Sequence, residues 1–239
     1  MPSLTPRRLT PELLDILAAD DRSAIESRRD LARLNWFMRN DAIIARHLKV
    51  LSGDRPPRTI LDLGGGDGTF ALRIARRLSR VWPKMSVTLL DRQHIVSEAT
   101  KEGFAALGWY FKVIEANVFD VMTALVPETY DVVVTNLFLH HFDDDQIRQL
   151  LAEVRHKTKL FVATEPQRGA WGLTATRMVG ALGCNSVTRH DARVSVEAGF
   201  AADELTQAWT CRDAWKLEER RVGPFTHIFY ASRVTDDAL

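Results

Sequence analysis

The residue types with the clearest capacity for chemistry lie together in residues 58–78, RTILDLGGGDGTFALRIARRL. Asp62 is followed by three consecutive glycines and by a fourth at Gly68. An apolar run precedes the glycines and a basic amphipathic run follows them, which predicts a strand, a glycine loop and a helix N-terminus. Glycines at such a turn let the backbone approach a ligand closely, so the segment is typical of a nucleotide-binding loop.

Two common nucleotide-binding loops do not fit this spacing. A phosphate-binding P-loop needs lysine and then serine or threonine after the glycines, but Thr69 follows Gly68 directly. The dinucleotide fingerprint GxGxxG, counted from Gly64, needs glycine or alanine where Thr69 stands. The pattern that fits is an acidic residue followed by glycines at alternate positions, namely Asp62, Gly64, Gly66 and Gly68.

This pattern resembles motif I of the class I S-adenosylmethionine-dependent methyltransferases, and later segments resemble further motifs of that family. VTLLD ends in Asp91, while EANVFD and YDVVVTNLFLHHF stand where the third and fourth motifs belong. The resemblance implies that Asp62 orients the methionine end of the cofactor S-adenosylmethionine and that Asp91 binds its ribose. It also implies adenine contacts at Asn117, where the family often has aspartate, and at Val118. The cofactor-binding residues implied in this way are Asp62, Gly64, Gly65, Gly66, Gly68, Asp91, Arg92, Asn117, Val118 and Asn136.

Two adjacent histidines, His140 and His141, are candidates for the general base that a hydroxyl acceptor requires. They follow the fourth expected strand, so they lie at the carboxyl edge of the sheet, where ligands bind in such folds. Histidine suits this role because it titrates near neutral pH. Either histidine could instead serve to cap the helix expected near Asp143, and the sequence does not choose between the two roles.

A third candidate base is His190, in the segment TRHDARVSVEAG. The segment predicts a short helix with Thr188 as N-cap and Gly199 just past its end, which places His190 in the first turn. A helix N-terminus favours the neutral ring, whereas Asp191 favours the charged one. A solvated surface position is an equally good interpretation of His190.

The acceptor class is narrowed by signatures that the sequence lacks. TNLF at residues 135–138 is not the Asn/Asp-Pro-Pro-Tyr/Phe signature of enzymes that methylate amide or amine nitrogen, and no metal cluster is evident. We therefore expect O-methylation of a small phenolic or polyketide-like molecule of secondary metabolism. C-methylation of an activated carbon and a non-catalytic regulatory protein are the alternatives. The residues expected near this acceptor are Arg33, Asn35, Trp36, Phe138, Phe142, and a helical stripe of Trp171, Ala175, Met178 and Leu182.

The elements that must position these residues alternate along the chain. Strands are expected at 59–63, 86–91, 110–119, 130–139 and 159–165, and helices at 69–82, 98–108 and 143–154. Such alternation predicts a doubly wound, mostly parallel α/β sheet with helices on both faces. Residues 215–222 and 226–234 are expected to close the sheet as an antiparallel pair, which gives a seven-stranded Rossmann-like methyltransferase fold.

Three parts of the chain are expected: a helical N-terminal cap at residues 1–52, the S-adenosylmethionine-binding domain at 53–239, and within it a helical acceptor-site insertion at 166–210. In the cap, a first helix is expected to start at Thr10-Pro11-Glu12. A second helical stretch from about residue 24 to 51 is expected to break near Asn40-Asp41.

The composition excludes several other classes of protein. The chain has 239 residues, a net charge of +1 and a hydrophobic content of 46%, which is ordinary for one globular domain and gives no reason to expect nucleic acid as a partner. Cys184 and Cys211 have no metal-binding spacing, so neither a disulfide framework nor a metal is expected. No apolar run suggests a membrane span or signal peptide, so a cytoplasmic protein is expected, with a homodimer left open.

Overall fold

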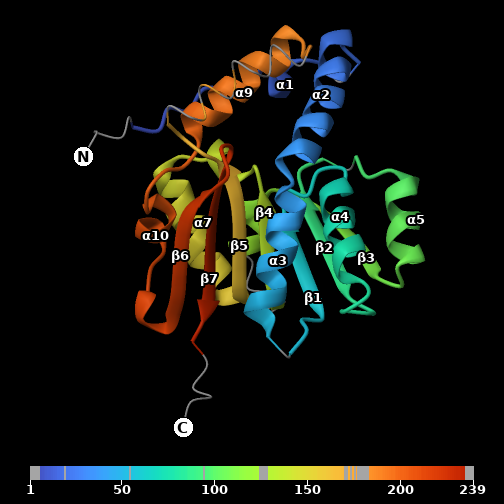
Figure 1. Ribbon diagram of the computed structural model, residues 1–239, viewed down its shortest axis with the longest axis vertical. Coiled ribbons are helices and arrows are strands. Elements are labelled where there is room, and N and C mark those ends of the chain that lie inside the picture. The colour runs from blue at the N-terminus through green and yellow to red at the C-terminus, as the bar shows by residue number, and fades with distance from the viewer. Residues whose placement is uncertain are drawn as a thin grey trace.

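The computed structural model describes residues 6–18, 20–53, 55–93, 95–123, 129–169 and 183–234, together with Gly172, Thr174 and Thr176. One sheet of seven strands, in the order β3-β2-β1-β4-β5-β7-β6, forms its centre (Figure 1). The strands are β1 (Thr59–Leu63), β2 (Ser86–Asp91), β3 (Tyr110–Glu115), β4 (Tyr130–Asn136), β5 (Thr158–Pro166), β6 (Trp215–Val222) and β7 (Thr226–Arg233). Strands β1 to β5 are parallel, and β7 pairs antiparallel with both β5 and β6. The predicted doubly wound sheet with an antiparallel closing pair is confirmed.

Helices cover both faces of the sheet and its upper edge. The described helices are α1 (Leu13–Ile16), α2 (Arg22–Met38), α3 (Asn40–Ser52), α4 (Thr69–Leu78), α5 (Glu98–Ala106), α6 (Val118–Thr123), α7 (Asp144–Lys157), α9 (Ser186–Ala198), α10 (Glu204–Ala208), and the 3₁₀ turns η1 (Leu139–His141) and η2 (Arg212–Ala214). Apolar residues of α3, α4 and α5 pack on one face of the sheet, and those of α6, α7 and α10 pack on the other. Two apolar cores thus enclose the parallel strands, whose near-continuous apolar sequences require burial on both faces.

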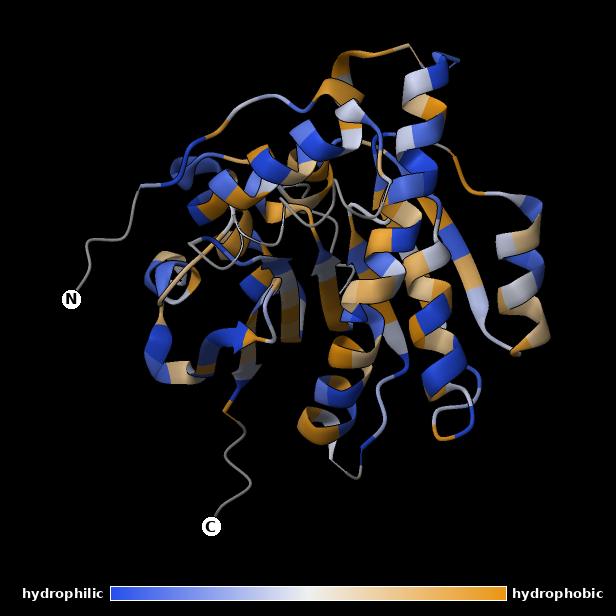
Figure 2. Ribbon diagram, turned by 45° about the horizontal axis from the view of Figure 1, so that its top comes forward, coloured by the Kyte–Doolittle hydropathy of each residue, from blue (hydrophilic) through white to orange (hydrophobic). Residues whose placement is uncertain are grey.

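Helices α2 and α9 lie above the carboxyl edge of the sheet, as Figures 1 and 2 show. Buried polar contacts join them: Thr188 Oγ1 donates to Ser27 Oγ at 3.0 Å, and the backbone N–H of Asn185 donates to Asp30 Oδ2 at 2.9 Å. Helices α2 and α9 therefore form one cover over the ends of the strands. The stripe expected at Trp171, Ala175, Met178 and Leu182 lies outside the described residues.

Several predicted element boundaries differ from the structure, including the ends of α4 and α7, which lie at Leu78 and Lys157. The first helix begins at Leu13 rather than near Thr10, because Asp191 accepts hydrogen bonds from the backbone N–H groups of Leu13 and Leu14 at 2.8 and 3.1 Å. The strand expected at 110–119 ends at residue 115 and the one expected at 130–139 ends at residue 136. The start of α9 also differs and is described below. The break expected near Asn40 is confirmed, since the chain turns at the residue before it with a φ of 54°.

Candidate active site

The glycine loop after β1 leaves open space beside the sheet edge. Gly64 and Gly66 have φ values of 70° and 54°, a region that side-chain-bearing residues rarely adopt. A Cβ atom at Gly64 would meet the Phe138 ring at 2.3 Å, whereas one at Gly66 would meet nothing within 4 Å. The backbone at Gly66 is therefore accessible to a ligand. Gly68 is the N-cap of α4, and a Cβ atom there would meet Leu89 and other packed side chains.

Two cavities meet above the carboxyl ends of the strands. The first cavity has a volume of about 470 Å³ and is lined by the glycine loop and by apolar residues of the cover. The second cavity has a volume of about 600 Å³ and lies beside the ends of β2 and β3. Four residues line both cavities and mark the junction between them: Glu12, His140, His141 and Ser195.

The structure brings nearly all of the predicted cofactor residues to this pair of cavities. The first cavity is lined by Asp62, Gly64, Gly65, Gly66 and Asn136. The second is lined by Asp91, Arg92, Asn117 and Val118. Gly68 lines neither of them, so its place in the motif is explained by the turn into α4.

Asp62 is the most perturbed acid of the site. Its side chain is buried, and its Oδ2 atom has no hydrogen-bond partner among the described residues. Burial raises the pKa of Asp62 to about 8, and the negative charge of Asp91 adds to this effect. A buried carboxylate without a donor, on the wall of a cavity, fits a ligand that brings a charged amino group. S-adenosylmethionine carries such a group at its methionine end.

Asp91 and Asn117 are held by local hydrogen bonds in the second cavity. The Asp91 carboxylate accepts from the backbone N–H groups of Gly66 and Gln93, both at 2.9 Å, and so ties the glycine loop to the end of β2. Asn117 Oδ1 accepts from the backbone N–H of Phe119 at 2.9 Å and thereby starts α6. The side-chain carbonyl of Asn117, where an adenine contact was expected, therefore already accepts a hydrogen bond at the start of α6.

Asn136 ends β4 inside a hydrogen-bond network that crosses the sheet edge. Its Oδ1 accepts from Asn40 Nδ2 at 2.7 Å and from Thr164 Oγ1 at 2.9 Å. Asn40 in turn accepts from Thr226 Oγ1 at 2.7 Å. Buried polar networks of this kind hold their members in one arrangement. The first turn of α3 is therefore fixed to the wall of the first cavity.

His140 is held by Glu165, a residue that is not among those predicted from the sequence. The Nδ1 atom of His140 lies 2.8 Å from Glu165 Oε2. Glu165 is fully buried and also accepts three backbone N–H groups, those of residues 138, 139 and 140, at 3.0, 2.9 and 3.3 Å. These contacts leave Nε2 of His140 directed to the junction, where it lies 3.6 Å from Glu12 Oε1. A carboxylate on one ring nitrogen leaves the other nitrogen to act on a ligand.

Two carboxylates determine the protonation of His140. Burial on its own would lower the pKa of His140, but the hydrogen bonds and charges of Glu12 and Glu165 outweigh it and raise that pKa to about 9. The same imidazole lowers the pKa of Glu12 against the opposing effect of burial. At neutral pH the junction therefore holds an imidazolium between two carboxylates.

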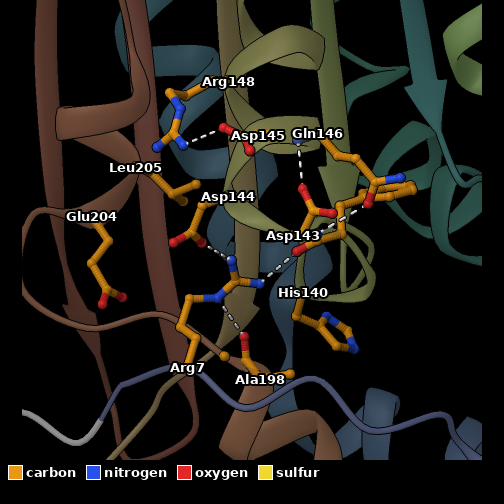
Figure 3. Close-up of polar contacts among 12 residues, drawn as sticks. Arg7, His140, Asp143, Asp144, Asp145, Gln146, Arg148, Ala198, Glu204 and Leu205 are labelled. Carbon is orange, nitrogen blue, oxygen red and sulfur yellow. Dashed lines mark hydrogen bonds and ion pairs between the residues drawn. The ribbon is translucent and has the colours of Figure 1, made fainter.

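Glu12 reaches the junction because the N-terminal segment is anchored across it. Arg7 donates to Asp144 Oδ1 at 2.7 Å and to the backbone carbonyls of Phe142 and Ala198 at 3.0 and 2.9 Å. Figure 3 shows its guanidinium between Asp144 and Ala198. The guanidinium also lies 4.4 Å above the Phe200 ring. Sequence offers no local signal for Glu12, since these contacts are all distant in the chain.

The remaining candidate histidines differ in position. His141 lies at the junction with its ring 4.3 Å from the His140 ring. Neither histidine caps α7, because Asp143 and Gln146 form a capping box there. His190 lines neither cavity, is 41% exposed at its side chain, and hydrogen-bonds the adjacent Asp191 at 3.0 Å.

The predicted position of His190 in a first helical turn is wrong. Helix α9 begins at Ser186 with Asn185 as its N-cap, because the Asn185 side chain accepts from the backbone N–H of Thr188 at 2.9 Å. His190 therefore lies in the second turn, beyond the strongest influence of the helix terminus. The predicted end of the helix at Gly199 is confirmed.

The aromatic and polar residues expected around the acceptor are divided among different places. Asn35 lines the first cavity, as does Phe37, which was not among the expected residues, whereas Trp36 is 71% exposed and lines an outer groove instead. Arg33 pairs with Asp30 and lines neither cavity. Phe138 and Phe142 line the second cavity. The apolar wall of the first cavity consists mainly of Leu31, Leu34, Phe37, Met38, Phe70, Leu137 and Phe225.

Comparison with known proteins indicates the methyltransferase class. Residues 60–159 match the family model described as a methyltransferase domain. An uncharacterized methyltransferase of Mycobacterium tuberculosis is 31% identical over 123 residues, which cover 48% of this chain and 57% of the relative. A 3-hydroxy-5-methyl-1-naphthoate 3-O-methyltransferase of Streptomyces sahachiroi is 32% identical over 95 residues, which cover 40% of this chain and 26% of the relative. This chain thus spans little more than half the length of one curated relative and about a quarter of the other.

A solved structure of the plantazolicin methyltransferase BpumL with bound SAH has the same fold, with a TM-score of 0.66, 14% identity, and coverage of 90% of this chain and 92% of that one. Residues 60–159 are therefore a methyltransferase domain of the class I S-adenosylmethionine-dependent superfamily, and S-adenosylmethionine is the cofactor of that class. Among the described residues, no helix has the length and apolar character needed to cross a membrane.

Proposed function

We propose that this protein transfers a methyl group from S-adenosylmethionine to an oxygen atom of a small aromatic acceptor. The observation that carries the proposal is His140: Glu165 holds its Nδ1 at 2.8 Å, and its Nε2 faces the junction of the two cavities. The bound cofactor supplies an electrophilic methyl group on a sulfonium with its leaving group already in place. What the chain must add is alignment and a proton acceptor, which contribute about 7–11 kcal/mol and about 10²–10⁴-fold in rate.

The residues of the two cavities divide this work. In the proposal, Asp62 and the glycine loop bind the methionine end, and Asp91 binds the ribose. The acceptor enters the first cavity, and its hydroxyl takes the place of Glu12 beside His140 Nε2. Removing Glu12 takes away one of the two carboxylates that raise the pKa of His140. His140 then accepts the hydroxyl proton while Glu165 stabilises the imidazolium that results.

The first cavity supports an apolar aromatic acceptor. Its volume of about 470 Å³ lies in the range of small-molecule sites, about 300–1,000 Å³. Aliphatic and aromatic side chains of α2 form one wall, and the junction supplies the polar groups. The naphthoate O-methyltransferase among the relatives supports a phenolic acceptor of secondary metabolism. The parts of the cover at residues 1–52 and 166–210 are proposed to determine which acceptor is taken.

The pH dependence of methyl transfer tests this assignment. The base of the free protein has a pKa of about 9, so kcat/KM for a phenolic acceptor is expected to rise through about pH 9. The profile of kcat is expected to rise at lower pH, because Glu12 no longer pairs with His140 in the complex. Glu165→Gln is expected to shift both profiles to lower pH and to reduce kcat about 10²-fold or more. His156→Ala, on the exposed side of α7, is the matched control. Profiles that Glu165→Gln leaves unmoved would reject His140 as the base.

A further inference from the structure

The side chains at the junction are suited to binding a metal ion as well as to acting as a general base. Suitable donor atoms of Glu12, His140 and His141 all lie within 4.8 Å of one another. We propose that these three side chains bind a Zn²⁺ ion or a similar divalent transition metal, and that the bound ion blocks methyl transfer. The block rests on the proposed function, whereas metal binding itself does not. The sequence gives no metal-binding spacing for this set, since Glu12 is remote from the histidines in the chain.

The donor set and its spacing suit zinc. Two imidazoles and a carboxylate are a known three-residue ligand set for Zn²⁺. Bonds of about 2.0–2.1 Å in tetrahedral geometry place the donor atoms about 3.3 Å apart. Glu12 Oε1 and His140 Nε2 are already 3.6 Å apart. His141 is exposed, so its ring has room to complete the set by a change of rotamer.

Two further contacts orient the ligands in the way that metal sites require. Glu165 binds Nδ1 of His140, so the nitrogen that would bind the metal is Nε2, which faces Glu12. A carboxylate behind a ligating histidine is typical of zinc sites and fixes the ring. Ser195 donates its hydroxyl hydrogen to Glu12 Oε1, which holds that carboxylate from the other side. Both arrangements exist before any ion binds.

An ion at this place would change the site in two ways. It would displace the proton of His140 Nε2 to solvent and take the lone pair of that nitrogen, which could then not accept the proton of an acceptor hydroxyl. It would also join Glu12, on the N-terminal segment, to η1 at the sheet edge, and so fix the cover across the junction. Because both cavities border the three ligands, the fourth metal position is open to water.

Co²⁺ binding to chelator-treated protein tests the site without reference to activity. We expect one Co²⁺ per chain with the visible absorption of tetrahedral cobalt, displaced by Zn²⁺. Glu12→Gln and His141→Ala are expected to weaken binding at least tenfold, and Glu165→Gln by about 10- to 100-fold. Glu153→Gln and His156→Ala, both on α7, are the matched controls. His141 and Glu12 are chosen because they are not core residues. Absence of Co²⁺ binding, or binding that these variants leave unchanged, would overturn the proposal.

Methylation assays with and without Zn²⁺ then separate the two claims. Zn²⁺ is expected to inhibit the wild-type protein over the concentration range in which it binds, and His141→Ala is expected to need at least tenfold more. Methylation that continues on the zinc-loaded protein would refute the block. Metal binding by a chain that methylates no acceptor would refute the proposed function and leave the metal site in place.

Discussion

Replacing Asp62 with asparagine is expected to stabilise the free protein and to weaken cofactor binding, two effects of opposite sign. Asp62 is buried and its Oδ2 has no partner among the described residues. Burial, with a contribution from Asp91, raises its pKa from 3.8 to about 8. A folded-state pKa above the unfolded one means that the folded state takes up a proton, so this group opposes folding increasingly as pH rises from about 4 to 8.

The size of the effect follows from the shift. At pH 7, about three units above the unfolded pKa of 3.8, the proton uptake of Asp62 lowers the free energy of unfolding by about 4 kcal/mol, since each unit corresponds to about 1.36 kcal/mol. The asparagine amide must be buried in the same place at a cost of about 1–3 kcal/mol. The net gain expected for Asp62→Asn is therefore about 1–3 kcal/mol, or at least 2 °C in Tm for a chain of this size. Urea unfolding at pH 5 and pH 8 is expected to show a larger gain at pH 8.

Cofactor binding by the same variant is expected to change in the other direction. A hydrogen bond to a charged group contributes about 1.5–3 kcal/mol, so the affinity for S-adenosylmethionine is expected to fall about 10- to 100-fold. Wild-type binding at pH 7 is expected to release a proton as Asp62 ionises, which calorimetry in two buffers measures. Asp67→Asn, at a more exposed position of the same cavity, is the control. A variant that is less stable and binds the cofactor normally would refute this reasoning.

Three further outcomes are expected. Gly64→Ala should lower the free energy of unfolding by about 1–3 kcal/mol in urea unfolding, because the added Cβ would meet the Phe138 ring at 2.3 Å and the φ is 70°. An unchanged free energy of unfolding would contradict the close packing of the loop against that ring. Arg7→Ala should raise KM for the acceptor more than it lowers cofactor affinity, since its contacts hold the segment that carries Glu12; equal effects on both would contradict this. The raised pKa of His140 should contribute about 3 kcal/mol of stability below about pH 6.5, and this contribution should be lost as pH rises through about 9. The free energy of unfolding of His140→Gln, measured across this pH range, should not show that loss.

The fold could be predicted from the sequence because its signals are local. Apolar runs of strand length alternate with amphipathic helical runs, and the resulting parallel sheet brings the ends of its strands to one edge. Asp62, Asp91 and Asn136 lie at or next to such strand ends, and the resemblance to the methyltransferase motifs had implied them as cofactor-binding residues. Glu165 lies at the end of β5 by the same rule, so the sequence contains a signal for it, which attention to the histidines alone misses.

The errors at helix starts have a common physical cause, which is competition from tertiary contacts. Thr188 has the right side chain for an N-cap, but its hydroxyl bonds to Ser27 and Asp30 of α2, and Asn185 caps the helix instead. The first helix likewise receives its cap from Asp191, a residue of α9. Such partners are distant in sequence, and no local pattern reports them.

Glu12 is the clearest example of what the sequence could not show. Its position depends on the N-terminal segment crossing the site, and that path depends on Arg7 reaching α7 and the end of α9. The pairing with His140 that determines the proton affinity of the junction is therefore a property of the folded chain alone.

Transfer of a labelled methyl group tests the proposed O-methylation most directly. S-adenosylmethionine carrying a ¹³C methyl group would be incubated with the protein and a set of phenols and hydroxynaphthoates, and the products identified by NMR. We predict a ¹³C methoxy signal with the wild-type protein, strongly reduced in Glu165→Gln that still binds the cofactor. A label on carbon, or no labelled product from folded protein that binds S-adenosylmethionine, would contradict O-methylation by this site.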